Sequence, residues 1–254
     1  MPAHSFPTGL SDVAESRFFI DAGLASGTFV ELPTNVAHHA AHVLRLREGD
    51  AVVLFNGRGG EFHGRLAKRG SGVELTRHVP VERESPVAFT LVQAWMATDK
   101  LEWLVEKSVE LGVARIVLAT ARRSVVRLDS VRLAKRVERL RDIAIAACCQ
   151  CGRNRVPPVL AIGDLGDAIA EAGAGATGLA LQPDASRSLI EIASAAAGPL
   201  AIAAGPEGGF DAGELAQLQR AGYRLARLGP RVLRTETAGL AALAALQGTV
   251  GDFA

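Results

Sequence analysis

The sequence predicts an α/β protein made of two regions, a small β-barrel with one helix followed by a parallel α/β domain. Three observations support this prediction. Residues 1–80 contain short alternating apolar runs interrupted by glycine, which is the pattern of short β-strands. The polar segment VERESP, ending at Pro86, reads as a linker. From there, residues 87–254 alternate apolar strand-like runs with helical patterns, which is typical of a parallel sheet covered by helices.

The first region is predicted from three runs, GTFVEL, DAVVLFNGRGGEFHGRLA and SGVELTRHVPV. The apolar positions Val52, Leu54, Phe62 and Leu66 fit β-strands with one buried face. The glycine-rich NGRGG between them predicts a hairpin turn. A single helix is expected from about Asn35 to Arg45.

The second region opens with the strand VAFTLVQAW. Asp99 and Glu102 have the spacing of a capping box, which predicts a helix from there to Gly112. The strand ARIVLAT follows, and a long basic helix is expected from about Ser130 to Cys148. The later strands are TGLALQP and PLAIAAG.

The C-terminal quarter is the most informative part of the chain. The strand that starts at Leu200 runs into the glycine-rich loop GPEGGF, and Asp211 and Glu214 then form a second capping box. That helix is expected to end near Ala221, followed by a strand over 223–228. The loop LGPRVLRTE comes next, and Thr235 or Thr237 caps a closing alanine-rich helix.

These two loops lie at the carboxyl ends of strands, where open α/β sheets bind ligands. GPEGGF lacks the G-x-G-x-x-G spacing of dinucleotide sites and the Lys-Ser/Thr of a P-loop. Glycine lets the main chain approach a ligand closely, which suits the edge of an adenine. A purely structural turn is the alternative. The second loop brings Arg231, Arg234, Thr235 and Glu236 together, which favours a site.

Basic residues are unevenly distributed, although the formal net charge is only +1. Residues 115–155 carry eleven basic and three acidic residues, and ten of the eleven are arginine. A local excess of this size is expected where a protein contacts phosphates, and arginine also stacks on bases. A solvated helix face is the alternative, but the excess favours RNA binding.

Other compartments and cofactors are disfavoured. No apolar run reaches the length of a transmembrane helix, and MPAHSFPTGL lacks the pattern of a signal peptide. The three cysteines, Cys148, Cys149 and Cys151, lie too close together for a disulfide framework and lack a second cluster for zinc. His38 and His42 have a spacing that can hold zinc but no accompanying ligands. We therefore expect a cytoplasmic protein without a metal.

Five segments together resemble the RsmE family: GPEGGF, LGPRVLRTETA, KLEWLVEKSVELGV, QCGRNRVPP and HAAHVLRLREGD. The resemblance covers nearly the whole chain. It implies a PUA-like RNA-binding barrel over residues 1–80 and a SPOUT-class α/β domain with a deep trefoil knot over residues 87–254. It also implies methylation of N3 of a uridine in 16S ribosomal RNA of the small ribosomal subunit, with S-adenosylmethionine as methyl donor, by a homodimer.

The resemblance also implies roles for individual residues. Main chain from three loops is expected to bind the cofactor: Leu181, Gln182, Pro183, Ala204, Gly205, Pro206, Glu207, Gly208, Gly209, Leu228, Gly229, Arg231, Val232 and Leu233. Arg234 and Glu236 are the expected catalytic residues. The residues expected to bind RNA are Arg122, Arg123, Gln150, Arg153 and Arg155. The family usually has Glu where this chain has Cys149, and Lys100, Glu106 and Glu110 match a helix of the family.

Other functions stay open at this point. A related enzyme could act on a ribose 2′-hydroxyl or on transfer RNA. A non-catalytic RNA-binding or ribosome-assembly protein could keep the same fold. A nucleotide-dependent oxidoreductase is disfavoured by the missing G-x-G-x-x-G.

Overall fold

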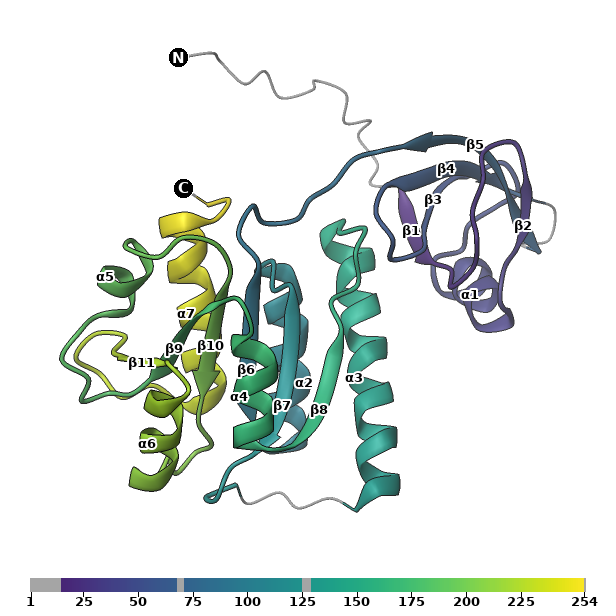
Figure 1. Ribbon diagram of the computed structural model, residues 1–254. Coiled ribbons are helices and arrows are strands. Elements are labelled where there is room, and N and C mark those ends of the chain that lie inside the picture. The colour runs from purple at the N-terminus through teal and green to yellow at the C-terminus, as the bar shows by residue number, and fades with distance from the viewer. Residues whose placement is uncertain (1–14, 68–70, 125–128, 254) are drawn as a thin grey trace, which may run out of the picture. The chain divides into compact units, whose positions relative to one another are not determined.

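The computed structural model describes residues 15–67, 71–124 and 129–253. The chain divides into two compact units, with the division between Glu82 and Arg83 (Figure 1). The segment MPAHSFPTGL and Arg127 of the basic segment lie outside the described residues.

The first unit is a curled antiparallel sheet with a short helix, as its sequence pattern predicts. Its described elements are β1 (Ser16–Phe19), β2 (Phe29–Glu31), α1 (Thr34–His38), the π-helical turn η1 (His39–Val43), β3 (Ala51–Phe55), β4 (Glu61–Leu66) and β5 (Gly72–Val79). The strands pair in the order β1-β3-β4-β5-β2, and only the β1–β3 pair is parallel.

The predicted core and turn of this unit are confirmed. Val52, Leu54, Phe62 and Leu66 belong to one cluster of buried side chains. The NGRGG hairpin joins β3 to β4, and the Arg58 amide donates a 3.1 Å hydrogen bond to the Asn56 side chain.

The second unit contains a six-stranded sheet in which every described pairing is parallel. Its elements are β6 (Phe89–Ala94), α2 (Thr98–Glu110), β7 (Arg115–Thr120), α3 (Ser130–Cys151), β8 (Val159–Asp164), α4 (Leu165–Gly173), β9 (Thr177–Leu181), α5 (Leu189–Ala193), β10 (Leu200–Ala204), α6 (Ala212–Arg220), β11 (Arg224–Ala226) and α7 (Thr235–Val250). The strand order is β11-β9-β10-β6-β7-β8. This is the parallel α/β domain that the sequence predicts.

Helices cover both faces of this sheet (Figure 1). Along β6, Val92 and Ala94 pack in a cluster with residues of α4 and α6. Leu91 and Gln93 point the other way, where Gly239 of α7 approaches them. Strand residues alternate between faces, so each central strand is buried on both sides. Every residue of β6 and β10 is buried.

Two of the three predicted helix caps differ from expectation. Asp211 and Glu214 form the predicted capping box, each accepting the other's backbone N–H at 2.8 Å. The box at Asp99 is wrong, because α2 begins at Thr98 and its N-cap is Ala97. Thr235 and Thr237 do not cap α7 either, because the N-cap is Arg234.

Some elements were not predicted. The strand β8 and the helices α4 and α5 lie between the basic helix and the glycine loops, and α3 extends three residues beyond the expected Cys148. No helix among the described residues is long and apolar enough to cross a membrane. The trefoil knot stays a prediction.

Candidate active site

A cleft of about 730 Å³ opens at the carboxyl edge of the parallel sheet. Its walls come from the segments that follow β9, β10 and β11 and from the beginnings of α2 and α7. The neighbouring strands β6 and β10 connect to their next strands in opposite directions along the sheet. Such a switch point leaves a crevice between loops that diverge, which is where α/β sheets bind ligands.

The structure brings nearly all of the expected cofactor residues to this cleft. Every one of them lines it except Gly229, and the expected catalytic residues Arg234 and Glu236 line it as well. The further lining residues, which were not assigned to the cofactor, to catalysis or to RNA, are Lys100, Asp184, Phe210, Ala226, Thr235 and Ala238. Residues up to 138 positions apart in sequence, from Lys100 to Ala238, therefore meet at one place.

The GPEGGF loop owes its shape to close backbone packing. The Gly209 amide donates a 2.8 Å hydrogen bond to the Pro206 carbonyl, and Gly209 has a φ of +67°, which favours glycine. A Cβ at Gly205 would lie 3.1 Å from the Phe210 amide nitrogen. Phe210 is buried and anchors the end of the loop. The loop therefore presents main chain to the cleft, with Glu207 as its charged side chain.

A buried amide ties the two loops together beneath the cleft. Gln93, at the carboxyl end of β6, has no exposed surface. Its Nε2 donates to the Thr235 hydroxyl at 3.1 Å and to the carbonyls of Ala204 and Gly205 at 3.4 Å. The Thr235 hydroxyl in turn donates to the Gly205 carbonyl. This network explains why Thr235 does not cap its own helix. A single amide side chain in the largely apolar strand VAFTLVQAW is the sequence signal that could have identified Gln93.

Lys100 contributes the positive charge on the α2 side of the cleft. Its ammonium lies 3.7 Å from Glu207 Oε1 and 3.6 Å from Glu236 Oε2. One lysine thus bridges the GPEGGF loop and the first turn of α7. Glu236 Oε2 is buried and has no hydrogen-bond partner among the described residues, since the ammonium stands beyond hydrogen-bond distance.

Arginines and one apolar side chain form the rim. Arg231 and Arg234 are exposed, and so is Val232, with 80% of its surface accessible. From the loop after β7, Arg123 donates a 2.8 Å hydrogen bond to the Gly208 carbonyl. Its neighbour Arg122 donates its backbone N–H to Glu214 and lies 3.4 Å from Asp211.

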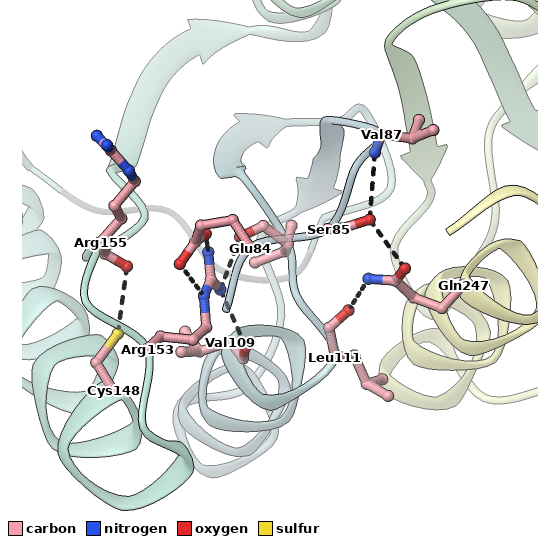
Figure 2. Close-up of polar contacts among 10 residues, drawn as sticks. Glu84, Ser85, Val87, Val109, Leu111, Cys148, Arg153, Arg155 and Gln247 are labelled. Atoms are coloured by element: carbon pink, nitrogen blue, oxygen red, sulfur yellow. Dashed lines mark hydrogen bonds and ion pairs between the residues drawn. The ribbon is translucent and has the colours of Figure 1, made fainter. Parts of the chain in front are cut away.

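Three residues expected to bind RNA lie elsewhere, near the end of α3. Gln150 is exposed in a groove of about 610 Å³ between α2 and α3. Arg155 is exposed in the loop that follows. Arg153 is only 4% exposed, and Figure 2 shows its guanidinium turned toward Glu84 and the Val109 carbonyl. The donors of Arg153 are thus used inside the protein, and its expected contact with RNA stays an untested prediction.

Two glutamates of α2 in this groove share one lysine. Lys107 lies between Glu106 and Glu110, at 2.7 and 2.8 Å, and these hydrogen bonds raise the pKa of Lys107 to about 12. The like charges of Glu106 and Glu110 are thus balanced by a lysine of their own helix.

The cysteines act as small packing residues. Cys148 is buried and donates its thiol to the Arg155 carbonyl at 3.6 Å, while Cys149 and Cys151 are half-buried. Burial raises the pKa of the Cys148 thiol to about 12. Within the described part of the chain, no three His, Cys, Asp or Glu side chains gather as they would around a metal ion.

Comparisons with known proteins agree with this geometry. Residues 83–247 match a family model described as an RNA methyltransferase domain, and residues 32–72 match one described as an RNA methyltransferase PUA domain. A relative from Mycobacterium bovis, named ribosomal RNA small subunit methyltransferase E, is 34% identical over 90% of each chain.

The chain belongs to the RsmE family of RNA methyltransferases.

Solved structures of relatives share the whole fold. The ribosomal RNA small subunit methyltransferase E of Neisseria gonorrhoeae, bound to S-adenosylmethionine, has a TM-score of 0.87 and 37% identity, covering 95% of this chain and 100% of its own. A Legionella pneumophila protein in complex with the same cofactor has a TM-score of 0.88 and 34% identity, covering 94% and 100%. Membership of the RsmE family confirms the predicted pairing of a PUA domain with a SPOUT-type α/β domain.

Proposed function

We propose that the protein transfers the methyl group of S-adenosylmethionine to N3 of a uridine in 16S ribosomal RNA of the small ribosomal subunit. The observation that carries the proposal is the convergence of both glycine loops, Lys100, Arg234 and Glu236 on one cleft of an RsmE-family fold. Two relatives with the same fold were solved with this cofactor, and other relatives are named as small-subunit ribosomal RNA methyltransferases.

The chemistry of the cleft suits the cofactor. Main chain of the GPEGGF loop and of the segments after β9 and β11 offers hydrogen-bonding groups to an adenine edge. Leu181, Leu228 and Leu233 supply apolar contacts for the ring. The buried, unbonded Oε2 of Glu236 is an acceptor suited to an amine, a hydroxyl or an imide N–H.

When bound, S-adenosylmethionine supplies a methyl group on a positively charged sulfur, a centre that needs no metal for transfer. The protein must align the methyl carbon with N3 of the uracil and remove the N3 proton. Glu236 accepts that proton, either directly or through a water molecule. Arg234, at the cleft rim, stabilises the negative charge that develops on the neighbouring carbonyl oxygens.

The RNA is held by separate groups. Arg122, Arg123 and Arg155 are exposed or line the cleft, and they suit phosphates, while Gln150 suits the edge of an extruded base. Residues 1–80 act as the RNA-binding module, and residues 87–254 bind the cofactor, catalyse and dimerise. Arg153 belongs to the protein interior and is left out of the RNA set.

The protein works as a homodimer in the cytoplasm. The helix α7 carries small residues on its partly exposed side, Ala241, Ala244, Ala245 and Gly248, which permit close contact with another helix. Free thiols at Cys148, Cys149 and Cys151 suit a reducing compartment. Light scattering at micromolar concentration tests the dimer, and a monomer there would contradict this part.

The deciding experiment is methyl transfer from labelled S-adenosylmethionine to small ribosomal subunits that lack native modification, followed by nucleoside mass spectrometry. We expect 3-methyluridine, loss of the product with Arg234→Met, and no transfer to naked transfer RNA. Cofactor binding without transfer would reject this substrate. Absence of cofactor binding would reject the methyltransferase and favour an RNA-binding assembly protein.

A further inference from the structure

The segment that enters the second unit is fastened to it at three successive residues. Arg83 donates a 2.9 Å hydrogen bond to the Gly152 carbonyl, and Glu84 forms an ion pair with Arg153. Ser85 donates to Gln247 Oε1 at 3.0 Å (Figure 2). Residues 83 and 84 therefore contact the loop that follows α3, whereas residue 85 contacts α7.

Every side of the Arg153 guanidinium is engaged. Its Nη1 donates to the carbonyls of Val109 and Val113, both at 3.0 Å. Its Nε donates to Glu84 Oε1 at 3.1 Å, and its Nη2 donates to Glu84 Oε2. A buried arginine that loses its carboxylate is left as an uncompensated charge, which destabilises its surroundings strongly. Glu84 is thus the residue that makes this position of Arg153 favourable.

The loop held in this way is short and fixed at both ends. It starts at Gly152, whose φ of +87° ends α3, and the next residue but one, Asn154, is fully buried. The buried thiol of Cys148 donates to the Arg155 carbonyl (Figure 2). Against this anchored backbone, only the side chains of Gln150 and Arg155 are exposed among residues 150–155.

We propose that Glu84 is a positioning residue for RNA binding. By orienting Arg153, it fixes the loop that presents Arg155 to a phosphate and the last turn of α3 that presents Gln150 to a base. The inference rests on the proposed function, since it assigns Gln150 and Arg155 to the RNA. It concerns the RNA side only, because neither Glu84 nor Arg153 lines the cleft at the glycine loops.

The chain offers a matched control for a merely structural role. Ser85 fastens the same segment to Gln247, which in turn donates to the Leu111 carbonyl at 2.8 Å. This second fastening does not involve residues 150–155. Ser85→Ala therefore weakens the attachment of the segment and leaves the loop as it is, whereas Glu84→Gln keeps the shape of the side chain and removes its charge.

The experiment compares the wild-type, Glu84→Gln, Arg153→Lys and Ser85→Ala proteins at full length. Four quantities are measured: the Kd for unmodified small ribosomal subunits, the KM for them in methyl transfer, the Kd for S-adenosylmethionine, and the Tm. We expect Glu84→Gln to raise the subunit Kd and KM by about tenfold, as a misplaced contact does, with the cofactor Kd within about twofold of wild type. Arg153→Lys, which loses the planar fork, should act in the same direction.

Ser85→Ala should lower the Tm without a comparable change in subunit Kd or KM. The inference is overturned if Glu84→Gln lowers the Tm but leaves the subunit Kd at the wild-type value, or if Ser85→Ala weakens subunit binding equally. If the wild-type protein binds subunits without methylating them, the proposed function is rejected. The comparison of subunit Kd values between the wild-type and Glu84→Gln proteins would still decide the role of Glu84. A wild-type protein that does not bind subunits would reject both.

Discussion

The side-chain amide of Gln93 donates a 3.1 Å hydrogen bond to the hydroxyl of Thr235, 142 residues further along the chain. Because both side chains also bond to the Gly205 carbonyl, one network fixes the end of β10 and the start of α7. The GPEGGF loop begins at the end of β10, and the second cofactor loop ends at the start of α7.

Gln93→Leu should weaken S-adenosylmethionine binding. The substitution fills the space with an apolar side chain but removes the donor to the Thr235 hydroxyl and one donor to the loop carbonyls, which costs about 1–3 kcal/mol for a buried group. We expect the cofactor Kd, measured by calorimetry, to rise by about fivefold or more. Thr235→Val should act in the same direction, and Thr235→Ser should restore wild-type binding. Equal Kd values for the valine and serine variants would contradict a role for the hydroxyl.

Lys100→Met should reduce methyl transfer more than it reduces stability. Without the ammonium, the carboxylates of Glu207 and Glu236 repel each other across the cleft, and Glu236 is displaced from its place as proton acceptor. We expect kcat to fall by about tenfold to a hundredfold, as for loss of one preorganised charge. Lys107→Met is the matched control. Lys107 is also an α2 lysine that lies between two glutamates, Glu106 and Glu110, but it lies outside this cleft. Comparable loss of kcat in both variants would argue against a local effect.

Gly209→Ala should destabilise the protein and its cofactor complex together. The φ of +67° places this residue in the left-handed region, where a side chain costs about 1–2 kcal/mol. Thermal unfolding with and without S-adenosylmethionine measures both effects. Gly163→Ala serves as the comparison, since Gly163 is exposed in β8 with no atom within 4 Å of the added Cβ, and the variant should retain the wild-type Tm or exceed it.

Cys148 should resist alkylation at pH 8, while the half-buried Cys149 and Cys151 react first. Burial raises the pKa of the Cys148 thiol from 9.0 to about 12, so the folded protein contains little of its thiolate. Mass spectrometry after iodoacetamide treatment of native and denatured protein measures the order of labelling. Early labelling of native Cys148 would contradict its burial.

The same pKa shift has a defined effect on stability. A group whose folded pKa lies above its unfolded pKa stabilises the fold below the unfolded value, and that contribution is lost as the pH rises toward the folded value. The free energy of unfolding should therefore decrease between pH 9 and 12, and Cys148→Ala should remove this part of the decrease. If the free energy of unfolding of the variant decreases as steeply as that of the wild type between pH 9 and 12, groups other than Cys148 cause the decrease.

The parts of the fold that were predictable from sequence depend on local interactions. Asp211 and Glu214 are three residues apart, so their reciprocal capping is visible in the sequence alone. The buried strands β6, β7, β9 and β10 are largely apolar runs, and the NGRGG turn carries its own glycines. The sequence also predicted that the two glycine loops lie close together, because the carboxyl ends of parallel strands meet at one edge of the sheet.

The interactions that escaped prediction join residues far apart in sequence. Arg153 resembled a phosphate ligand because Glu84, its partner, lies 69 positions earlier. Thr235 resembled a helix cap because the Gly205 carbonyl that receives its hydroxyl lies 30 positions earlier. Lys100 belongs to the KLEWLVEKSVELGV segment. Its ion pairs with Glu207 and Glu236 could not be predicted, because they depend on how α2, the GPEGGF loop and α7 meet.

The position of the two cofactor loops along the sequence determines when a newly made chain first acquires a cofactor site. Both glycine loops and α7 belong to the last fifth of the sequence, and their anchor, Gln93, is made more than a hundred residues earlier. At about 5–20 residues per second of synthesis, the first unit has several seconds to fold before the loops exist. A chain that ends prematurely before residue 235 lacks Thr235, Glu236 and α7 and has no complete cleft. Methyl-donor binding by this protein therefore requires that synthesis has passed Thr235 and Glu236 and reached α7.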